Sequence, residues 1–200
     1  EILIGLVGSE MCIRDRVFLP EFDRLMRTPQ NNPHHCLNVG EHTLRAMQAV
    51  RPDKILRLTM LFHDFGKPDC ASADENGMDH FHGHGAVSSK MAEEILKRLR
   101  YDNDTIDRVR ELVYWHDMEI LPEKRAVRRA ASKVGKELFP LLLEVKQADL
   151  AAQSDYQRPQ KEEWLRSLHD IYEQIQEEGD CLSLSLIHIS EPTRPISISY

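Results

Sequence analysis

The stretch LTMLFHDFGK, residues 58–67, places an adjacent histidine and aspartate at the end of an apolar run. At this spacing Leu56, Met60 and His63 share one face of a helix, so the predicted helix points His63 into the core. An imidazole or carboxylate buried there needs a partner, because removing an unpaired charge from water is costly. The pair His63–Asp64 therefore predicts a polar site inside a helical core.

Four more residues of the same chemical types fall on the apolar sides of their own predicted helices. Each belongs to a stripe of apolar residues at helical spacing, as His84 does with Val87 and Met91. A single polar residue on an apolar face is most often satisfied within the core. A whole set of metal-binding type is hard to satisfy except around a shared cation. The candidate metal ligands are His42, His63, Asp64, His84, His116 and Asp149.

Imidazole and carboxylate ligands suit a divalent transition metal, with Mn, Ni, Co, Fe and Zn as candidates and Mg as a further one. The sequence leaves open whether one or two ions bind. Asp64 has two oxygens and can bridge two metals, which makes it the first candidate catalytic residue. Two ions about 3.5–4 Å apart would activate water and clamp a phosphate during in-line attack. Lys67 could offset the phosphate charge as a second catalytic candidate, or it could be a solvated loop lysine.

The spacing of apolar residues predicts an all-α fold in one domain, without strand alternation long enough to matter. The chain from 65 to 83 interrupts the helices, since it carries turn residues such as Gly66, Pro68 and Gly77. The helices are expected at 20–27, 38–51, 53–64, 84–100, 104–117, 123–135, 138–153 and 160–178.

The chain carries 33 acidic and 26 basic residues, a formal net charge of −7. It therefore lacks the overall basic footprint of a nucleic-acid-binding protein, although local basic patches remain open. Its apolar start, EILIGLVG, is too short to span a membrane and has no basic flank. The widely spaced cysteines Cys36, Cys70 and Cys181 make neither a disulfide framework nor a zinc knuckle and favour a cytoplasmic protein.

One predicted helix, EKRAVRRAASKVGK at 123–136, concentrates basic side chains. It is the local candidate for contacting an RNA backbone, and a solvated basic face is the alternative. The candidate RNA-binding residues are Arg125, Arg128, Arg129 and Lys133.

The other histidines have more than one interpretation. His34 and His35 precede the first candidate ligand by about two helical turns, and they could donate a proton to a leaving group or contact phosphate. A loop or capping role is the alternative, and His35 is the third candidate catalytic residue. His80 and His82 alternate along an extended approach, so only some of these rings can face the site. His169 is expected at the surface or as a satisfied core residue.

The chain resembles the HD superfamily of metal-dependent phosphohydrolases, and within it the HD region of bacterial CCA-adding tRNA nucleotidyltransferases. The resemblance spans nearly all of 28–183 and rests on five ordered motifs: HHCLNVGEHTL, LFHDFGK, HFHGHGAVS, VYWHD and QADLAAQSDY. It implies an HD-domain helical bundle over 17–183. The resemblance implies that the first metal is held by His42, His63, Asp64 and Asp149, and that His84 and His116 hold a second metal, as in binuclear members.

The resemblance implies hydrolysis of phosphomonoesters, 2′,3′-cyclic phosphates or nucleotides. A nucleotidyltransferase catalytic domain would carry a Gly-Ser motif and a DxD strand near its start. Neither is found near the start of this sequence outside the adapter-like stretch, so nucleotide addition is not expected of this fragment. One alternative is a helical domain that positions tRNA for a missing transferase, and another is a free-standing HD hydrolase. The expected partners are a nucleotide or phosphate-ester substrate and tRNA, with no membrane, while the oligomeric state stays open.

Two stretches near the ends resemble translated sequencing-adapter sequence: VGSEMCIRDR at 7–16 and LSLIHISEPTR at 184–194. We therefore expect residues 1–16 and 184–200 to be non-native additions to a fragment of a longer protein. Sequence that was never selected to pack against the core should be poorly ordered, and its removal should leave the unfolding midpoint unchanged or slightly raised.

Overall fold

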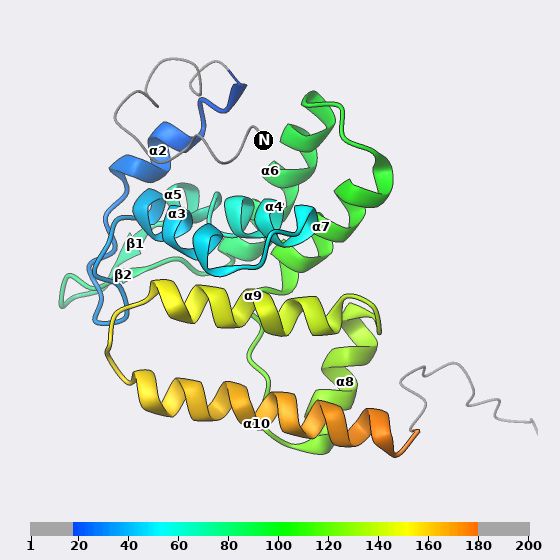
Figure 1. Cartoon of the computed structure of the whole chain (residues 1–200). Helices are drawn as coiled ribbons and strands as arrows, with labels where there is room; N and C mark the ends of the chain where they lie inside the picture. The colour runs from blue at the N-terminus through cyan, green and yellow to red at the C-terminus, as the bar shows by residue number, and fades with distance from the viewer. Residues whose placement is uncertain (1–17, 180–200) are drawn as a thin grey trace, which may run out of the picture.

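A computed structural model describes residues 18–179, and this part of the chain is built almost entirely of helices (Figure 1). The adapter-like segments, 1–16 and 184–200, lie outside the described residues. The all-α prediction is confirmed. Within residues 18–179, no helix is both long and apolar enough to cross a membrane.

Every predicted helix is present, and each end lies within two residues of its expected position. The interruption between α4 and α6 also holds a short helix and an antiparallel pair of strands, which aligns Ser72 with His80 and Ala73 with Asp79. The elements are α2 (Phe22–Arg27), α3 (Val39–Ala49), α4 (Lys54–Phe62), α5 (Lys67–Cys70), β1 (Ser72–Ala73), β2 (Asp79–His80), α6 (His84–Arg98), α7 (Asn103–Trp115), α8 (Lys124–Val134), α9 (Phe139–Ala152) and α10 (Arg158–Glu177).

Side-chain caps fix where three of these helices begin. The Asn38 side chain accepts a hydrogen bond from the backbone N–H of Glu41, and the Glu41 carboxylate accepts one from the N–H of Asn38. Asp53 and Asp102 cap α4 and α7 by accepting a backbone N–H from the first turn. Each such cap stabilises a helix by about 0.5–2 kcal/mol. The caps also fix the start of α3, α4 and α7, the helices that carry or precede three of the candidate ligands.

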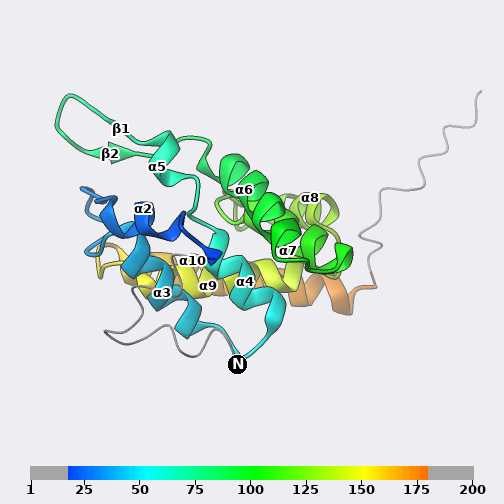
Figure 2. The ribbon, with the colours of Figure 1, turned by 90° about the horizontal axis from the view of Figure 1, so that it is seen from above.

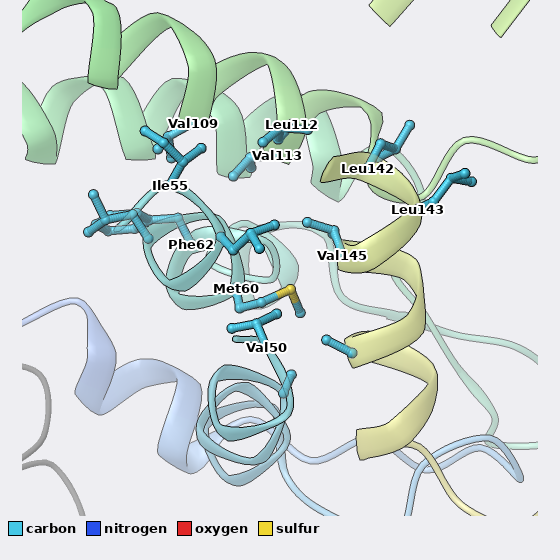
Figure 3. Close-up of a cluster of buried hydrophobic side chains, with 14 of the residues drawn as sticks. Val50, Ile55, Met60, Phe62, Val109, Leu112, Val113, Leu142, Leu143 and Val145 are labelled. Carbon is cyan, nitrogen blue, oxygen red and sulfur yellow. The ribbon is translucent and has the colours of Figure 1, made fainter. Parts of the chain in front are cut away.

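The core lies where the apolar faces of α3, α4, α7 and α9 meet. Figure 3 shows Met60 and Phe62 of α4 between side chains of α7 and α9, including Leu112 and Val145. All four side chains are fully buried. α6 packs on α7, while α10 packs on α8 and α9. The helix that leads into the His63–Asp64 pair is therefore fixed at the centre of the bundle.

α4 and α7 each end one residue before a candidate ligand. The last helical residues are Phe62 and Trp115, and His63 and His116 follow as C-terminal caps that keep helical backbone angles. The centroids of the two imidazole rings lie 5.3 Å apart. The ends of two helices that are far apart in sequence thus bring two ligands together.

Gly66 allows the turn after Asp64 to approach α6 closely. A β-carbon at Gly66 would lie 2.6 Å from the carbonyl oxygen of His84 and 2.8 Å from the backbone nitrogen of Ser88. Instead, the Gly66 N–H donates a hydrogen bond of 2.8 Å to the Ser88 hydroxyl. Any side chain would push α6 away, so Gly66 sets how near His84 comes to Asp64.

The β1–β2 hairpin projects from one end of the bundle (Figure 2). It is tied to the loop that precedes α3, because the Asp79 N–H donates to the carbonyl oxygen of Asn31 at 3.2 Å. The N–H of Asn31 in turn donates to the Asp79 carboxylate at 2.7 Å. The hairpin and this loop, separated by almost fifty residues in sequence, therefore lie side by side and are joined by two hydrogen bonds.

Candidate metal centre

The structure brings all six candidate metal ligands together around Asp64. His42, His63 and Asp64 form one buried group with ligand atoms close enough to hold an ion, and Asp64, His84 and His116 form another. We call the part around His42, His63 and Asp149 the first side, and the part around His84 and His116 the second side. Asp64 belongs to both.

On the first side, four ligand groups converge, with the distances between their facing atoms from 2.9 to 3.8 Å. The Nε2 atom of His42 lies 2.9 Å from Oδ1 of Asp149 and 3.3 Å from Nε2 of His63. Oδ2 of Asp64 lies 3.2 Å from Nε2 of His63 and 3.7 Å from Nε2 of His42. Ligands bound to one metal at about 2.0–2.2 Å stand roughly 3 Å apart, so these spacings fit a shared ion.

On the second side, the other oxygen of the same carboxylate faces two more histidines. Oδ1 of Asp64 lies 3.4 Å from Nε2 of His84 and 3.9 Å from Nε2 of His116. The two Nε2 atoms lie 3.1 Å from each other. The two oxygens of Asp64 therefore point at opposite pairs of imidazoles, as a bridging carboxylate must.

The backbone selects which nitrogen of three rings is available. The Nδ1 atoms of His63, His84 and His116 lie 2.7–2.8 Å from the carbonyl oxygens of Met60, Phe81 and Val113. A carbonyl oxygen only accepts hydrogen bonds, so each Nδ1 carries the hydrogen and donates it. In the neutral ring, Nε2 then presents a lone pair to the centre of the site.

The facing imidazole nitrogens are more stable with a cation between them than without one. Two neutral rings at His84 and His116 would aim lone pairs at each other across 3.1 Å, which is repulsive unless a proton or a metal lies between them. Nitrogen and carboxylate oxygen are also the donors that divalent transition metals prefer. The residues present therefore fit a metal centre.

The ionisation states favour metal binding as well. Burial alone would raise the pKa of Asp64, but His63 and Lys67 hold that pKa well below its ordinary value. Burial, together with the neighbouring histidines, lowers the pKa of His116 to about 3. Asp64 is thus ionised and His116 neutral near pH 7, the forms that bind metal without first losing a proton.

Lys67, one of the candidate catalytic residues, lies inside the site. Its Nζ atom is 2.8 Å from Oδ2 of Asp64 and donates a hydrogen bond of 2.7 Å to Oε1 of Gln30. The residue is buried, and its ammonium lies over the ring of Phe81. The alternative of a solvated loop lysine is therefore wrong, because Lys67 is only 6% exposed and begins the short helix α5.

A pocket of about 280 Å³ opens onto three of the six ligands, Asp64, His84 and Asp149. His35, the third candidate catalytic residue, borders it in the loop before α3, with its ring against that of His42. Burial, and then the charge of Lys67, lower the pKa of His35 to about 3, so its ring is neutral near pH 7. The lining residues are Asn32, His35, Asp64, Lys67, Asp79, His80, Phe81, His82, Gly83, His84, Asp117, Asp149 and Gln153.

The remaining histidines divide between the pocket and its surroundings. His80 and His82 line the pocket, with their rings stacked 5.5 Å apart. His34 packs against the ring of Tyr156 and does not line the pocket. His169 lies half-buried on α10.

Two side chains that orient candidate ligands were not predicted from the sequence. Gln153 donates a hydrogen bond of 2.9 Å to Oδ2 of Asp149 and accepts one of 2.6 Å from Lys161. The buried Lys146 donates to the carbonyl oxygens of His116 and Met118 at 2.7 and 2.8 Å. A signal existed for each, because Gln153 lies one helical turn after Asp149 and Lys146 lies one turn after the apolar Leu142.

The candidate RNA-binding residues lie on α8, at the opposite end of α9 from the hairpin (Figure 1). Arg125, Arg129 and Lys133 are exposed, and no carboxylate of residues 18–179 lies within ion-pair distance of them. Arg128 differs, because its side chain is half-buried and lies 3.7 Å from the carboxylate of Glu178. The charge of Arg128 is therefore partly compensated, and its contact with RNA stays a prediction.

Comparison with known proteins gives one family and a set of relatives. The HD domain model matches residues 34–153, which include all six candidate ligands. The chain is 35% identical over 161 residues to the CC-adding tRNA nucleotidyltransferase of Thermus thermophilus, covering 78% of this chain and 35% of that protein. It is 34% identical over 140 residues to the A-adding tRNA nucleotidyltransferase of Deinococcus radiodurans, covering 67% of this chain and 32% of that protein. The chain thus spans about a third of the length of these relatives.

Proposed function

The chain belongs to the HD domain family, and from this premise we propose that it is a metal-dependent phosphohydrolase module. Its substrates are phosphomonoesters, 2′,3′-cyclic phosphates or nucleotides. The observation that carries the proposal is the placement of Asp64, whose two oxygens face separate pairs of imidazole Nε2 atoms. This buried carboxylate pairs with Lys67 and faces imidazoles with both of its oxygens, a placement that matches the bridging ligand of a two-ion hydrolase.

The six ligands would hold one or two divalent ions, with Mn, Ni, Co, Fe or Zn as candidates and Mg as a further one. When bound, such ions polarise a phosphoryl oxygen and make water a usable nucleophile near neutral pH. The protein's part is to fix the donors in place. Backbone carbonyls orient three of the imidazoles, and Gln153 orients Asp149.

Lys67 and His35 are proposed to act on the phosphate itself. The Lys67 ammonium lies at the pocket and is held by Gln30, so it offsets negative charge that arrives next to Asp64. Nδ1 of His35 is buried and has no hydrogen-bond partner among residues 18–179. A polar atom in that state gains a hydrogen bond when a phosphate oxygen or hydroxyl group of the substrate comes within reach.

The relatives suggest a larger setting. Their names describe enzymes that add nucleotides to tRNA, and this chain corresponds to about a third of their length. We propose that residues 17–183 are the HD domain of such a cytoplasmic protein, with its transferase region elsewhere in the parent chain, and that 1–16 and 184–200 are adapter-derived. Resequencing the parent gene tests this directly, because natural sequence at both ends would contradict it.

The test of hydrolysis combines metal analysis with a screen of phosphate esters. Purified protein should bind transition metal and hydrolyse at least one of p-nitrophenyl phosphate, 2′,3′-cyclic AMP or a nucleoside monophosphate. Asp64→Ala should lose both properties, while His169→Ala, on α10, should keep both. Protein that stays fully folded yet binds no metal and hydrolyses none of these compounds would favour the alternative of a non-catalytic tRNA-positioning domain.

A further inference from the structure

We propose that α8 and the end of α7 form a docking surface for an RNA strand, separate from the metal pocket. We define this α7/α8 surface by Tyr114, Trp115, Arg125, Arg129 and Lys133. The proposal goes beyond phosphate-ester hydrolysis and does not depend on it, because none of these five residues lines the pocket.

Within residues 18–179, no carboxylate lies within ion-pair distance of the three cations of this surface. The segment from Lys124 to Lys136 holds six basic residues and no acidic one, in a chain whose net charge is −7. Glu178 offsets part of the charge on the inner side of the cluster, because its single carboxylate pairs with both Lys124 and Arg128. The outer cations keep their charge, and like charges that repel one another do nothing to stabilise the helix. An external polyanion is the natural partner of such a row.

The outer cations stand in line. Arg125, Arg129 and Lys133 follow each other at intervals of four residues, which places them on one face of α8 about 6 Å apart along the helix axis. The opposite face is apolar and packed, since Val127, Ala130 and the rest of that stripe are buried. A regular row of cations on a fixed helix suits the regular row of phosphates along a nucleic-acid strand better than it suits a single small anion.

The row leads to an exposed aromatic side chain. The Nζ atom of Lys133 lies 5.8 Å from the centre of the Trp115 ring, and Tyr114 packs edge-on against the same ring at 4.7 Å. Tyr114 is 47% exposed, so the face of its ring is accessible from solvent. Unpaired RNA bases stack on aromatic side chains of this kind beside phosphate-binding cations. The combination of cations and an open ring is what favours RNA over a plain polyanion.

The cationic row lies away from the first side of the metal centre, whereas the aromatic end of the surface adjoins the second side, because Tyr114 and Trp115 precede His116. α8 packs against α9 near the start of that helix (Figure 1), and Asp149 lies close to its end. The ten-residue step from Phe139 to Asp149 spans about 15 Å. RNA held on α8 would therefore leave the pocket open to a small phosphate ester.

Fluorescence anisotropy with a labelled tRNA transcript, in EDTA and over a range of salt concentrations, tests the proposal. The triple variant Arg125→Gln/Arg129→Gln/Lys133→Gln should bind about tenfold or more weakly and flatten the slope of log K against log salt by about 2, since each phosphate contact contributes roughly 0.7–0.9. The matched control Arg45→Gln/Lys90→Gln/Arg166→Gln removes the same charge from α3, α6 and α10 and should bind like the parent. Tyr114→Ala should weaken binding without changing the salt slope.

Four results would overturn the proposal: no RNA binding by the parent at low salt, equal losses in the two triple variants, an unchanged affinity in the first triple variant, or preferential binding to phosphatidylserine vesicles. Thermal unfolding of each variant shows that the fold is kept. Hydrolysis of small esters, assayed with metal, should be the same in both triple variants. Its absence would count against the hydrolase function and not against RNA docking.

Discussion

The two sides of the metal pocket use the same donor atoms in different surroundings. The first side adds the carboxylate of Asp149 to the shared Asp64 and has Lys67 at 2.8 Å from the shared carboxylate. Among residues 18–179, the second side has no ligating carboxylate of its own and depends on His84 and His116. A cation gains more from two ionised carboxylates than from one. The first side should be the tighter of the two, because Asp149 both offsets the charge of Lys67 and adds a fourth donor to that side.

The sides also differ in how their ligands are held. Asp149 is oriented by side chains, first Gln153 and then Lys161 behind it. His84 and His116 are oriented by main-chain carbonyls within their own turns, and Lys146 fixes the segment after His116. Disturbing one side should therefore spare the other, and the shared Asp64 should be the exception.

Replacing Asp64 should produce the largest effect. Asp64→Ala removes the ligand common to both sides, so metal affinity should fall by more than about 100-fold, since partners that only orient a ligand already cost about 10–100-fold. Isothermal titration with Mn²⁺ measures this, and the thermal stabilisation given by Mn²⁺ should vanish with it. If Asp64→Ala kept either binding event unchanged, Asp64 would not be shared.

Asp149→Asn should separate the two sides. The amide keeps the shape of the side chain but loses its charge, so the first binding event should weaken by more than about tenfold while the second is retained. Titration of this variant beside His116→Ala, which should show the opposite pattern, measures the difference. Equal loss of both events in both variants would mean that the pocket acts as one site.

Lys146→Met should have a smaller effect, confined to the second side. The substitution leaves the carbonyl oxygens of His116 and Met118 without this donor, which should lower the free energy of unfolding by about 1–3 kcal/mol. Affinity on the second side should fall by about 10–100-fold. Chemical denaturation and metal titration measure the two effects, and a variant that weakened only the first side would contradict this role.

Lys161→Met should have the smallest effect, because it acts on Asp149 only through Gln153. The lost hydrogen bond to Gln153 should weaken first-side affinity by less than about tenfold. The same titration measures it, with Glu162→Gln on the exposed face of α10 as the control. A loss as large as that of Asp149→Asn would show that Lys161 contributes more than orientation.

Much of the site could be predicted because its ligands obey local rules. His42, His84 and Asp149 lie on apolar helix faces at helical spacing, and periodicity reports which face is buried. The predicted helix starts also agreed with the observed ones, because capping residues such as Asn38 and Asp53 mark them in the sequence. Lys67 is a different case. Its burial depends on Gln30 and Phe81, which lie elsewhere in the chain, so no local pattern could decide between a solvated and a buried lysine.

The sequence by itself determined the all-α fold, the positions of the helices and which residues face inward, because apolar periodicity and capping act over a few neighbouring residues. Only the tertiary structure decided how those residues meet: the two oxygens of Asp64 directed at opposite imidazole pairs, Lys146 fixed on the carbonyl of His116, and Arg128 paired with Glu178. Each of these contacts joins helices distant in sequence. Their partners are selected by packing and by the cost of leaving a buried polar group unsatisfied, and neither acts along the chain.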